Sequence, residues 1–229
     1  WNGTLSLEAE AFSYSFEGLQ VDFFNAVVWS NVTYNAGTAD TEGIEFSAVW
    51  NPENISGLTL SGSVLFLDSG YEDFVAPCYA GQRPSNGCDI FIPGSVPQQQ
   101  LGGEDRLLAP DFSGYFGVNY ERPVGQNLML GSTINLQFKG DHSFSEFGHP
   151  NAEQSGYELL DAGLRIGSQD GQWQLALIGK NLTEEYAVLF SRDAPSTGFG
   201  TGTEAGVLAD LQNTPILGRT MELVFTYRY

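Results

Sequence analysis

The last ten residues, TMELVFTYRY (220–229), alternate between apolar and polar side chains. The apolar parity carries Met221, Leu223, Phe225, Tyr227 and Tyr229, and the polar parity carries Thr220, Glu222, Thr226 and Arg228, with Val224 as the exception. A repeat of two residues predicts a β-strand with one apolar face and one polar face. Soluble sandwiches and membrane barrels both use such strands, so the rest of the chain has to decide between them.

Similar alternating segments fill most of the chain. Together with the terminal segment they predict about nine strands, at 3–14, 19–28, 38–50, 57–67, 111–121, 127–140, 156–167, 172–188 and 220–229. Most are ten residues or longer, whereas the mean strand of soluble proteins has about 5 to 6 residues. A tilted strand that spans a membrane needs roughly 9 to 11 residues. The lengths therefore favour membrane-spanning strands.

The polar parity of these segments is too hydrophilic for a dry core. It carries Glu8, Glu10, Glu45, Asn135, Gln137, Lys139, Asp161, Arg165 and Glu222. This face must meet water, so the apolar face must meet either a second sheet or lipid. Aromatic residues at strand ends near the tight turns, namely Trp50, Tyr120, Trp173 and Tyr229, are typical of the girdles of membrane barrels. The pattern favours lipid.

The connections between the segments alternate in length. SFEG (15–18), NPENISG (51–57), RPVGQ (122–126) and SQDG (168–171) predict tight turns, whereas 68–110, 141–155 and 191–216 predict long loops. The link SNVTYNA (30–36) is the exception, because it is brief where a long loop is due. This order predicts an antiparallel up-and-down meander with the tight turns at one end and the long loops at the other.

Composition excludes other classes. The chain has nine Lys and Arg residues and 28 Asp and Glu residues, which gives a net charge of −19. Nucleic acid is therefore not an expected partner, because phosphate binding needs clustered cations. The chain has no run of 18 or more apolar residues, so a transmembrane helix is not expected. The chain begins at Trp1 without a signal peptide, and we interpret residues 1–229 as one domain portion of a longer, processed protein.

The two cysteines lie in CYAGQRPSNGC (78–88), a segment whose Gly, Pro, Ser and Asn residues indicate a loop. We predict a disulfide between Cys78 and Cys88 in an oxidising compartment, with two free thiols as the alternative. The chain has no other cysteine and no histidine beside these two, so a zinc site is not expected.

Candidate chemical sites are few. His142 and His149 lie in GDHSFSEFGHPNAEQ (140–154), where they could bind a metal with Asp141, Glu146 and Glu153. Polar residues in an exposed loop need no such explanation, so we predict no metal site. A nucleophile elbow is absent, and GFGTGTEAG (198–206) lacks the lysine and helix of a phosphate-binding loop. We therefore expect no cofactor and no enzymatic activity.

Six stretches occur in order along the chain: NAGTADTEGIEFSAVWNP (35–52), GLTLSGSVLFLDSGYEDF (57–74), LAPDFSGYFGVNYE (108–121), GYELLDAGLRIG (156–167), GKNLTEEYA (179–187) and GRTMELVFTYRY (218–229). Together they resemble the carboxyl-terminal strands of TonB-dependent outer-membrane receptors. The resemblance implies that the chain forms the last part of a 22-stranded barrel closed around an amino-terminal plug. The plug and the motif that contacts TonB would lie outside these residues.

The resemblance also implies partners and a location. Phe225, Tyr227 and Tyr229 would form the signal read by the barrel-assembly machinery, and the receptor would lie in the outer membrane of a Gram-negative bacterium, in contact with lipid. It would import a scarce small nutrient, such as a ferric siderophore, cobalamin or an oligosaccharide, with energy coupled through TonB. The alternatives are a passive porin or adhesin-type barrel and a secreted carbohydrate-binding β-sandwich.

Overall fold

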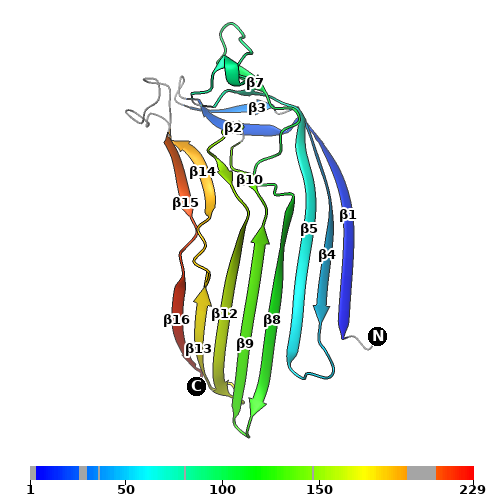
Figure 1. The fold of residues 1–229 in the computed structure, drawn as a ribbon, viewed down its shortest axis with the longest axis vertical. Helices are drawn as coiled ribbons and strands as arrows, with labels where there is room; N and C mark the ends of the chain where they lie inside the picture. Colours follow the sequence, from blue (N-terminus) through cyan, green and yellow to red (C-terminus); the bar gives the residue numbers. More distant parts are fainter. Residues whose placement is uncertain (1–3, 26–29, 36, 80, 146, 195–209) are drawn as a thin grey trace.

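Eight long strands form one antiparallel sheet in which each strand pairs with its neighbours in the chain (Figure 1). They are β1 (Leu5–Glu17), β4 (Thr38–Trp50), β5 (Leu58–Asp73), β8 (Phe112–Val124), β9 (Leu128–Lys139), β12 (Tyr157–Ser168), β13 (Trp173–Lys180) and β16 (Thr220–Tyr227). The structure is a computed structural model that describes residues 4–25, 30–35, 37–79, 81–145, 147–194 and 210–229. The predicted all-β, up-and-down meander is confirmed.

The helical content of the described ranges is a single 3₁₀ turn, Pro84–Asn86. No helix among these residues has the length and apolar character needed to cross a membrane.

The strand register brings the apolar parities of all eight strands onto one face. One row across the sheet runs from Leu7 through Ala48, Gly62, Phe116 and Leu136 to Leu160. This apolar belt stays uncovered within the described chain, and Leu7, Leu164 and Leu223 are 71%, 63% and 70% exposed. An apolar face of this extent is unfavourable in water but favourable in hydrocarbon. The belt therefore favours the lipid interpretation over the sandwich.

Aromatic side chains lie at both ends of the belt. At the loop end, Phe112 lies between Phe66 and Phe138 on neighbouring strands, with ring centroids 5.0 Å and 5.1 Å apart. At the turn end, Trp173 pairs with Tyr227 across β13 and β16. The turn-end girdle was expected from the sequence, whereas the loop-end row of phenylalanines was not.

The opposite face of the sheet carries the polar parity. On it, Arg165 donates from Nε and Nη2 to Glu121 Oε1, at 3.0 Å and 2.6 Å, and from Nη2 to Asn119 Oδ1 at 3.0 Å. These three residues come from two strands, β8 and β12, that are separated by β9 in the sheet. A cation held by carboxylate and amide groups across a strand is suited to a wet inner wall.

The predicted count of about nine strands in the wall is one too high. The segment 19–28 does not join the sheet, because β2 (Gln20–Asn25) pairs with β3 (Ser30–Asn35) in a separate hairpin; residues 26–29 lie outside the described chain. The tight turn predicted at 15–18 is also wrong, since β1 continues to Glu17 and pairs with β4 over its whole length. The hairpin and its flanking residues fill 18–37, which supplies the long loop that the sequence pattern lacked.

The predicted strand 172–188 ends early, at Lys180. Asn181 has φ 49° and Glu184 has φ 59°, a left-handed conformation that does not continue a β-ladder. The Asn181 side chain stabilises the bend, because its Nδ2 donates to Glu185 O at 2.8 Å and its Oδ1 accepts from Glu185 N at 2.8 Å. Beyond the bend, β14 (Val188–Ala194) pairs with β15 (Asp210–Pro215) as a second separate hairpin.

All long connections lie at one end of the wall, and both chain ends lie near the tight turns at the other (Figure 1). The loop end also carries two shorter pairs, β6 (Val75–Pro77) with β7 (Gln98–Gln100) and β10 (His142–Ser143) with β11 (Glu153–Gln154). A meander with this asymmetry places its long loops at a single end of the barrel wall.

Candidate functional site

The long loops share a small hydrophobic core above the sheet. It consists of Val21, Ala39, Tyr71, Phe74, Ala76 and Leu101, with Leu19 and Phe147 packed against it. Phe74 is fully buried, and its ring centroid lies 4.8 Å from that of Tyr71. Leu19 and Val21 come from the segment between β1 and β4, Phe74, Ala76 and Leu101 from the loop after β5, and Phe147 from the loop after β9, so three loops meet at this core.

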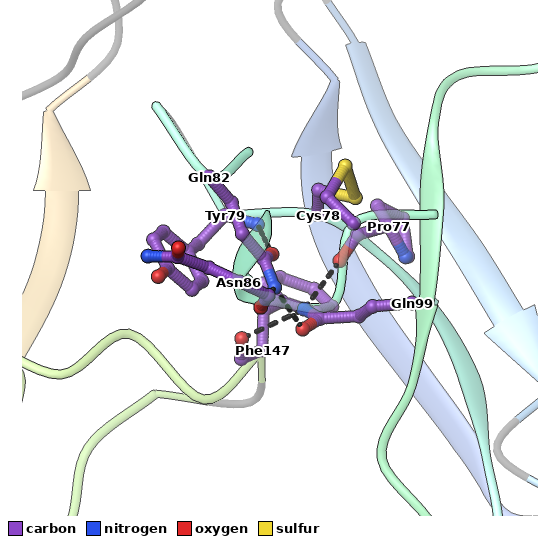
Figure 2. The surroundings of a disulfide bond; sticks show 8 residues. Pro77, Cys78, Tyr79, Gln82, Asn86, Gln99 and Phe147 are labelled. Atoms are coloured by element: carbon purple, nitrogen blue, oxygen red, sulfur yellow. Dashed lines mark hydrogen bonds between the residues drawn. A yellow bond between two sulfur atoms is a disulfide. The ribbon is translucent and has the colours of Figure 1, made fainter. Parts of the chain in front are cut away.

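A buried glutamine joins two of these loops by hydrogen bonds (Figure 2). Gln99 Nε2 donates to Pro77 O at 3.0 Å and to Phe147 O at 2.8 Å, and its Oε1 accepts from Gln82 Nε2 at 2.6 Å. Gln99 is only 5% exposed, so these partners replace water at both ends of its amide. Sequence reasoning did not single out this residue, since a glutamine in a loop carries no pattern.

Cys78 and Cys88 form a disulfide, with their Cα atoms 5.6 Å apart, as predicted (Figure 2). The bond closes a segment that contains the 3₁₀ turn Pro84–Asn86. Gln82, inside the same segment, also donates to Asn86 O at 2.9 Å. For a sequence separation of 10, the chain-entropy model gives a stabilisation of about 3 kcal/mol. The disulfide therefore pre-orders the outermost part of the loop.

His142 and His149 lie in the interior of the loop cluster, 5% and 9% exposed. The His149 ring lies 4.8 Å from the Tyr79 ring, and its Nδ1 accepts from Asn151 N at 3.1 Å. His142 Nδ1 donates to Gly140 O at 2.9 Å, and its ring meets Phe144 edge-on at 5.1 Å. Packing explains both histidines.

The structure describes only part of the set of candidate metal ligands in the loop 140–154. The described part of the chain contains no group of three or more His, Cys, Asp or Glu side chains placed to hold a metal ion. Glu146, one of the candidate ligands, lies outside the described residues, as does the Gly-rich segment 198–206.

A cavity of about 180 Å³ lies where the loop after β5 meets the loop after β9. Acidic residues dominate its lining, with Glu104, Asp105 and Asp111 on one loop and Asp141 and Glu153 on the other. Burial raises the pKa of Asp105, and the nearby carboxylates of Asp111 and Asp68 raise it further. A positive charge placed among these carboxylates would lower their mutual repulsion.

His142 adds an acceptor to the same cavity. Burial lowers its pKa, opposed by the hydrogen bond to Gly140 O, so the imidazole is neutral at pH 7. In that form the Nδ1 proton is committed to Gly140 and Nε2 presents a lone pair. Sequence reasoning weighed His142, Asp141 and Glu153 together but had no signal for Glu104 and Asp105, because only the loop packing brings those two near.

Comparison with known families gives one match. The family model described as TonB dependent receptor-like, beta-barrel, matches residues 1–182. No curated protein matches the chain.

Solved structures with the same fold include two receptors. The ferric yersiniabactin uptake receptor FyuA from Yersinia pestis superposes with a TM-score of 0.68 at 16% identity, over 98% of this chain and 28% of that chain. The siderophore receptor PiuA from Acinetobacter baumannii gives a TM-score of 0.65 at 15% identity, over 100% of this chain and 27% of that one. The chain thus spans little more than a quarter of the length of the receptors that it resembles.

Proposed function

Because this chain belongs to the TonB-dependent receptor-like β-barrel family, we propose that residues 1–229 form one stretch of wall, with its surface loops, of a receptor that takes up a scarce nutrient across an outer membrane. The observation that carries this proposal is the uncovered apolar belt on a meander whose opposite face is polar. Such a wall needs further strands, because within the described chain β1 and β16 each pair along one edge only, and lipid does not tolerate unpaired backbone groups.

In this proposal the loops capture the nutrient and the wall holds them at the membrane surface. A plug inside the complete barrel would couple release of the nutrient to TonB, and the receptor would reside in the outer membrane of a Gram-negative bacterium. A ferric siderophore is the first ligand class to test, since FyuA and PiuA are described as siderophore receptors. Cobalamin and oligosaccharides are the ligand classes to test next. The chain would bind and transport without chemistry of its own.

The proposed function is tested with the full-length receptor, expressed in a Gram-negative host that lacks its own siderophore receptors. We expect uptake of ⁵⁵Fe from a panel of ferric siderophores to require both the receptor and an intact TonB. The control is the same strain without TonB. Uptake that continues without TonB would instead support the passive porin, and a water-soluble full-length protein would support the secreted sandwich.

We also propose that Phe225, Tyr227 and Tyr229 are read during barrel assembly. They share the outward parity of the last strand and its continuation, and are 64%, 60% and 113% exposed. Changing Phe225 and Tyr229 to Asp should lower the amount of folded receptor several-fold, measured by its heat-modifiable gel mobility in isolated outer membranes. Thr226→Asp, on the other face, is the control. Equal amounts of folded receptor from the Phe225/Tyr229 variant and from the Thr226 control would contradict the proposal.

A further inference from the structure

The apolar face of the sheet contains a groove of about 470 Å³ toward the tight-turn end of the strands. Ser132 on β9 lines it, between Tyr120 on β8 and Leu164 on β12 in the same row of the register. The serine side chain is much shorter than those of its two neighbours, so it leaves a depression in the surface. Three more leucines extend the lining: Leu130, Leu175 and Leu223.

The groove can hold a hydrocarbon chain. Its volume lies within the range of about 300–1,000 Å³ that is usual for small-ligand sites. Apart from Ser132, the side chains named above are aliphatic or aromatic, so they offer mainly dispersion contacts. An acyl chain gains from such contacts, whereas a polar ligand gains little. Any preference for one kind of lipid therefore has to come from the rim of the groove.

A cation lies at this rim. Arg122 pairs with Leu130 in the register of β8 and β9, so it lies on the apolar face next to a lining residue. The eight strands of the wall contain four Lys and Arg residues, and the register places the other three on the polar face: Lys139, Arg165 and Lys180. Among these strands, Arg122 is thus the single cation on the apolar face.

Arg122 has no carboxylate partner among the described residues. It is exposed, and neither ion pair of the described chain includes it. The adjacent carboxylate, Glu121, lies on the opposite face, where it accepts from Arg165. A guanidinium is always charged and forms paired hydrogen bonds with phosphate oxygens. In a chain with a net charge of −19, such a cation beside an apolar groove indicates a ligand that joins a negative group to an apolar chain.

The depth of Arg122 suits a lipid headgroup. Its row of the register, which includes Leu130 and Leu175, lies one row from the girdle pair Trp173 and Tyr227. From there the long side chain can extend its guanidinium to the headgroup level while its methylene groups stay in hydrocarbon. The headgroup would belong to the leaflet on the side of the tight turns.

We propose that this groove and Arg122 bind one anionic phospholipid from the leaflet at the turn end, with an acyl chain in the groove and the phosphate on the guanidinium. The inference rests on the proposed function only in taking the apolar face as lipid-facing. The rest of the belt offers hydrocarbon contacts without a cation, so it has no reason to prefer one headgroup. The site at Arg122 would prefer a negative one.

The test titrates the full-length receptor, purified in detergent and washed free of lipid, with dioleoyl phosphatidylglycerol, and measures bound lipid by native mass spectrometry. Dioleoyl phosphatidylcholine, which has the same acyl chains and no net charge, is the reference lipid. We expect one phosphatidylglycerol to bind about fivefold more tightly than phosphatidylcholine. Arg122→Gln should remove this preference, since one cation near an anionic lipid contributes about that factor.

Two matched controls separate charge from shape. Lys180→Gln removes the same charge from the polar face of β13 and should keep the preference. Ser132→Leu fills the groove with a side chain that hydrocarbon tolerates, and should weaken binding of both lipids by about tenfold, because each displaced methylene group of the acyl chain loses its contacts. Ala48→Leu adds bulk on the same face of β4, outside the groove, and should leave binding unchanged.

The proposal is overturned if the unmodified receptor binds the two lipids equally, if Arg122→Gln keeps the preference, or if a folded Ser132→Leu variant binds as the unmodified receptor does. Selective retention of lipopolysaccharide in place of phosphatidylglycerol would also overturn it. Heat-modifiable gel mobility shows which variants are folded, and if Ser132→Leu is not, the comparison of Arg122→Gln with Lys180→Gln decides.

Failure of this proposal and failure of the proposed function give different results. Lipid binding is measured without iron or TonB, so a receptor that does not support uptake can still show the preference for phosphatidylglycerol. A membrane-embedded receptor that supports uptake but binds both lipids equally would contradict the lipid site alone. A full-length protein that is soluble without detergent would contradict the proposed function itself.

Discussion

Arginine at both Leu164 and Leu177 should make the assembled barrel less stable by about 4–8 kcal/mol, since each arginine at the middle of a lipid-facing band costs about 2–4 kcal/mol. The two leucines pair directly across β12 and β13 on the apolar face, and they are 63% and 42% exposed. Two positive charges side by side in hydrocarbon would also repel each other.

The measurement is urea unfolding of the full-length receptor refolded into phospholipid vesicles, followed by gel mobility and tryptophan fluorescence. The matched control places arginine at Ile178 and Glu222, which pair across β13 and β16 on the inner face; Ile178 is the residue next to Leu177 on β13. We expect a much smaller loss there, because that face meets water. If both variants unfold at the same urea concentration, the assignment of the two faces is wrong.

Phe74→Ala should lower the stability of the folded loop cluster by about 3–5 kcal/mol, the usual range for truncating a fully buried phenylalanine to alanine. Phe74 is the largest fully buried side chain of the described residues, and it packs against Tyr71 in the core shared by three loops. Its loss leaves a cavity that the loops can close only by giving up their contacts.

The effect should stay local, because the eight strands of the wall do not depend on this core for their pairing. We expect faster hydrogen exchange and faster proteolysis within 74–111 and 140–156, with unchanged protection of β8 and β9. The control is Phe91→Ala in the same loop, whose side chain is 64% exposed and should cost little. Unchanged exchange in Phe74→Ala would show that the shared core does not hold the loops in place.

The wall was predictable from the sequence because its period of two is repeated over long segments, and a polar face rich in carboxylates cannot be a dry core. The same period of two led to the incorrect prediction that segment 19–28 is a strand of the wall. Alternation shows that a segment is a strand but not which partner it takes, and here the partner is the adjacent segment 30–35. Alternation also failed to predict the early end of β13. That end is set by the left-handed conformation of Asn181, which is a property of the bend and not of the alternating pattern.

The loop cluster was much less predictable than the wall. The disulfide followed from a spacing of 10 and a loop composition, both of which are visible in one dimension. The position of Gln99 between two loops, and the approach of Glu104 and Asp105 to Asp141, depend on contacts between segments about 36 to 48 residues apart. No periodicity reports such contacts, so an acidic cavity could be recognised only after the loops were placed.

The neighbour-by-neighbour strand order has a consequence for the order in which the molecule can form. Each strand of the wall needs only the strand before it, so hairpins can be added one at a time at a small cost in chain closure. The Cys78–Cys88 bond spans only ten positions and can close before any of them. The shared core of the loops cannot form this early, because it needs β4, β5, β8 and β9 to be paired first. The loop cluster can therefore form only after these four strands have paired.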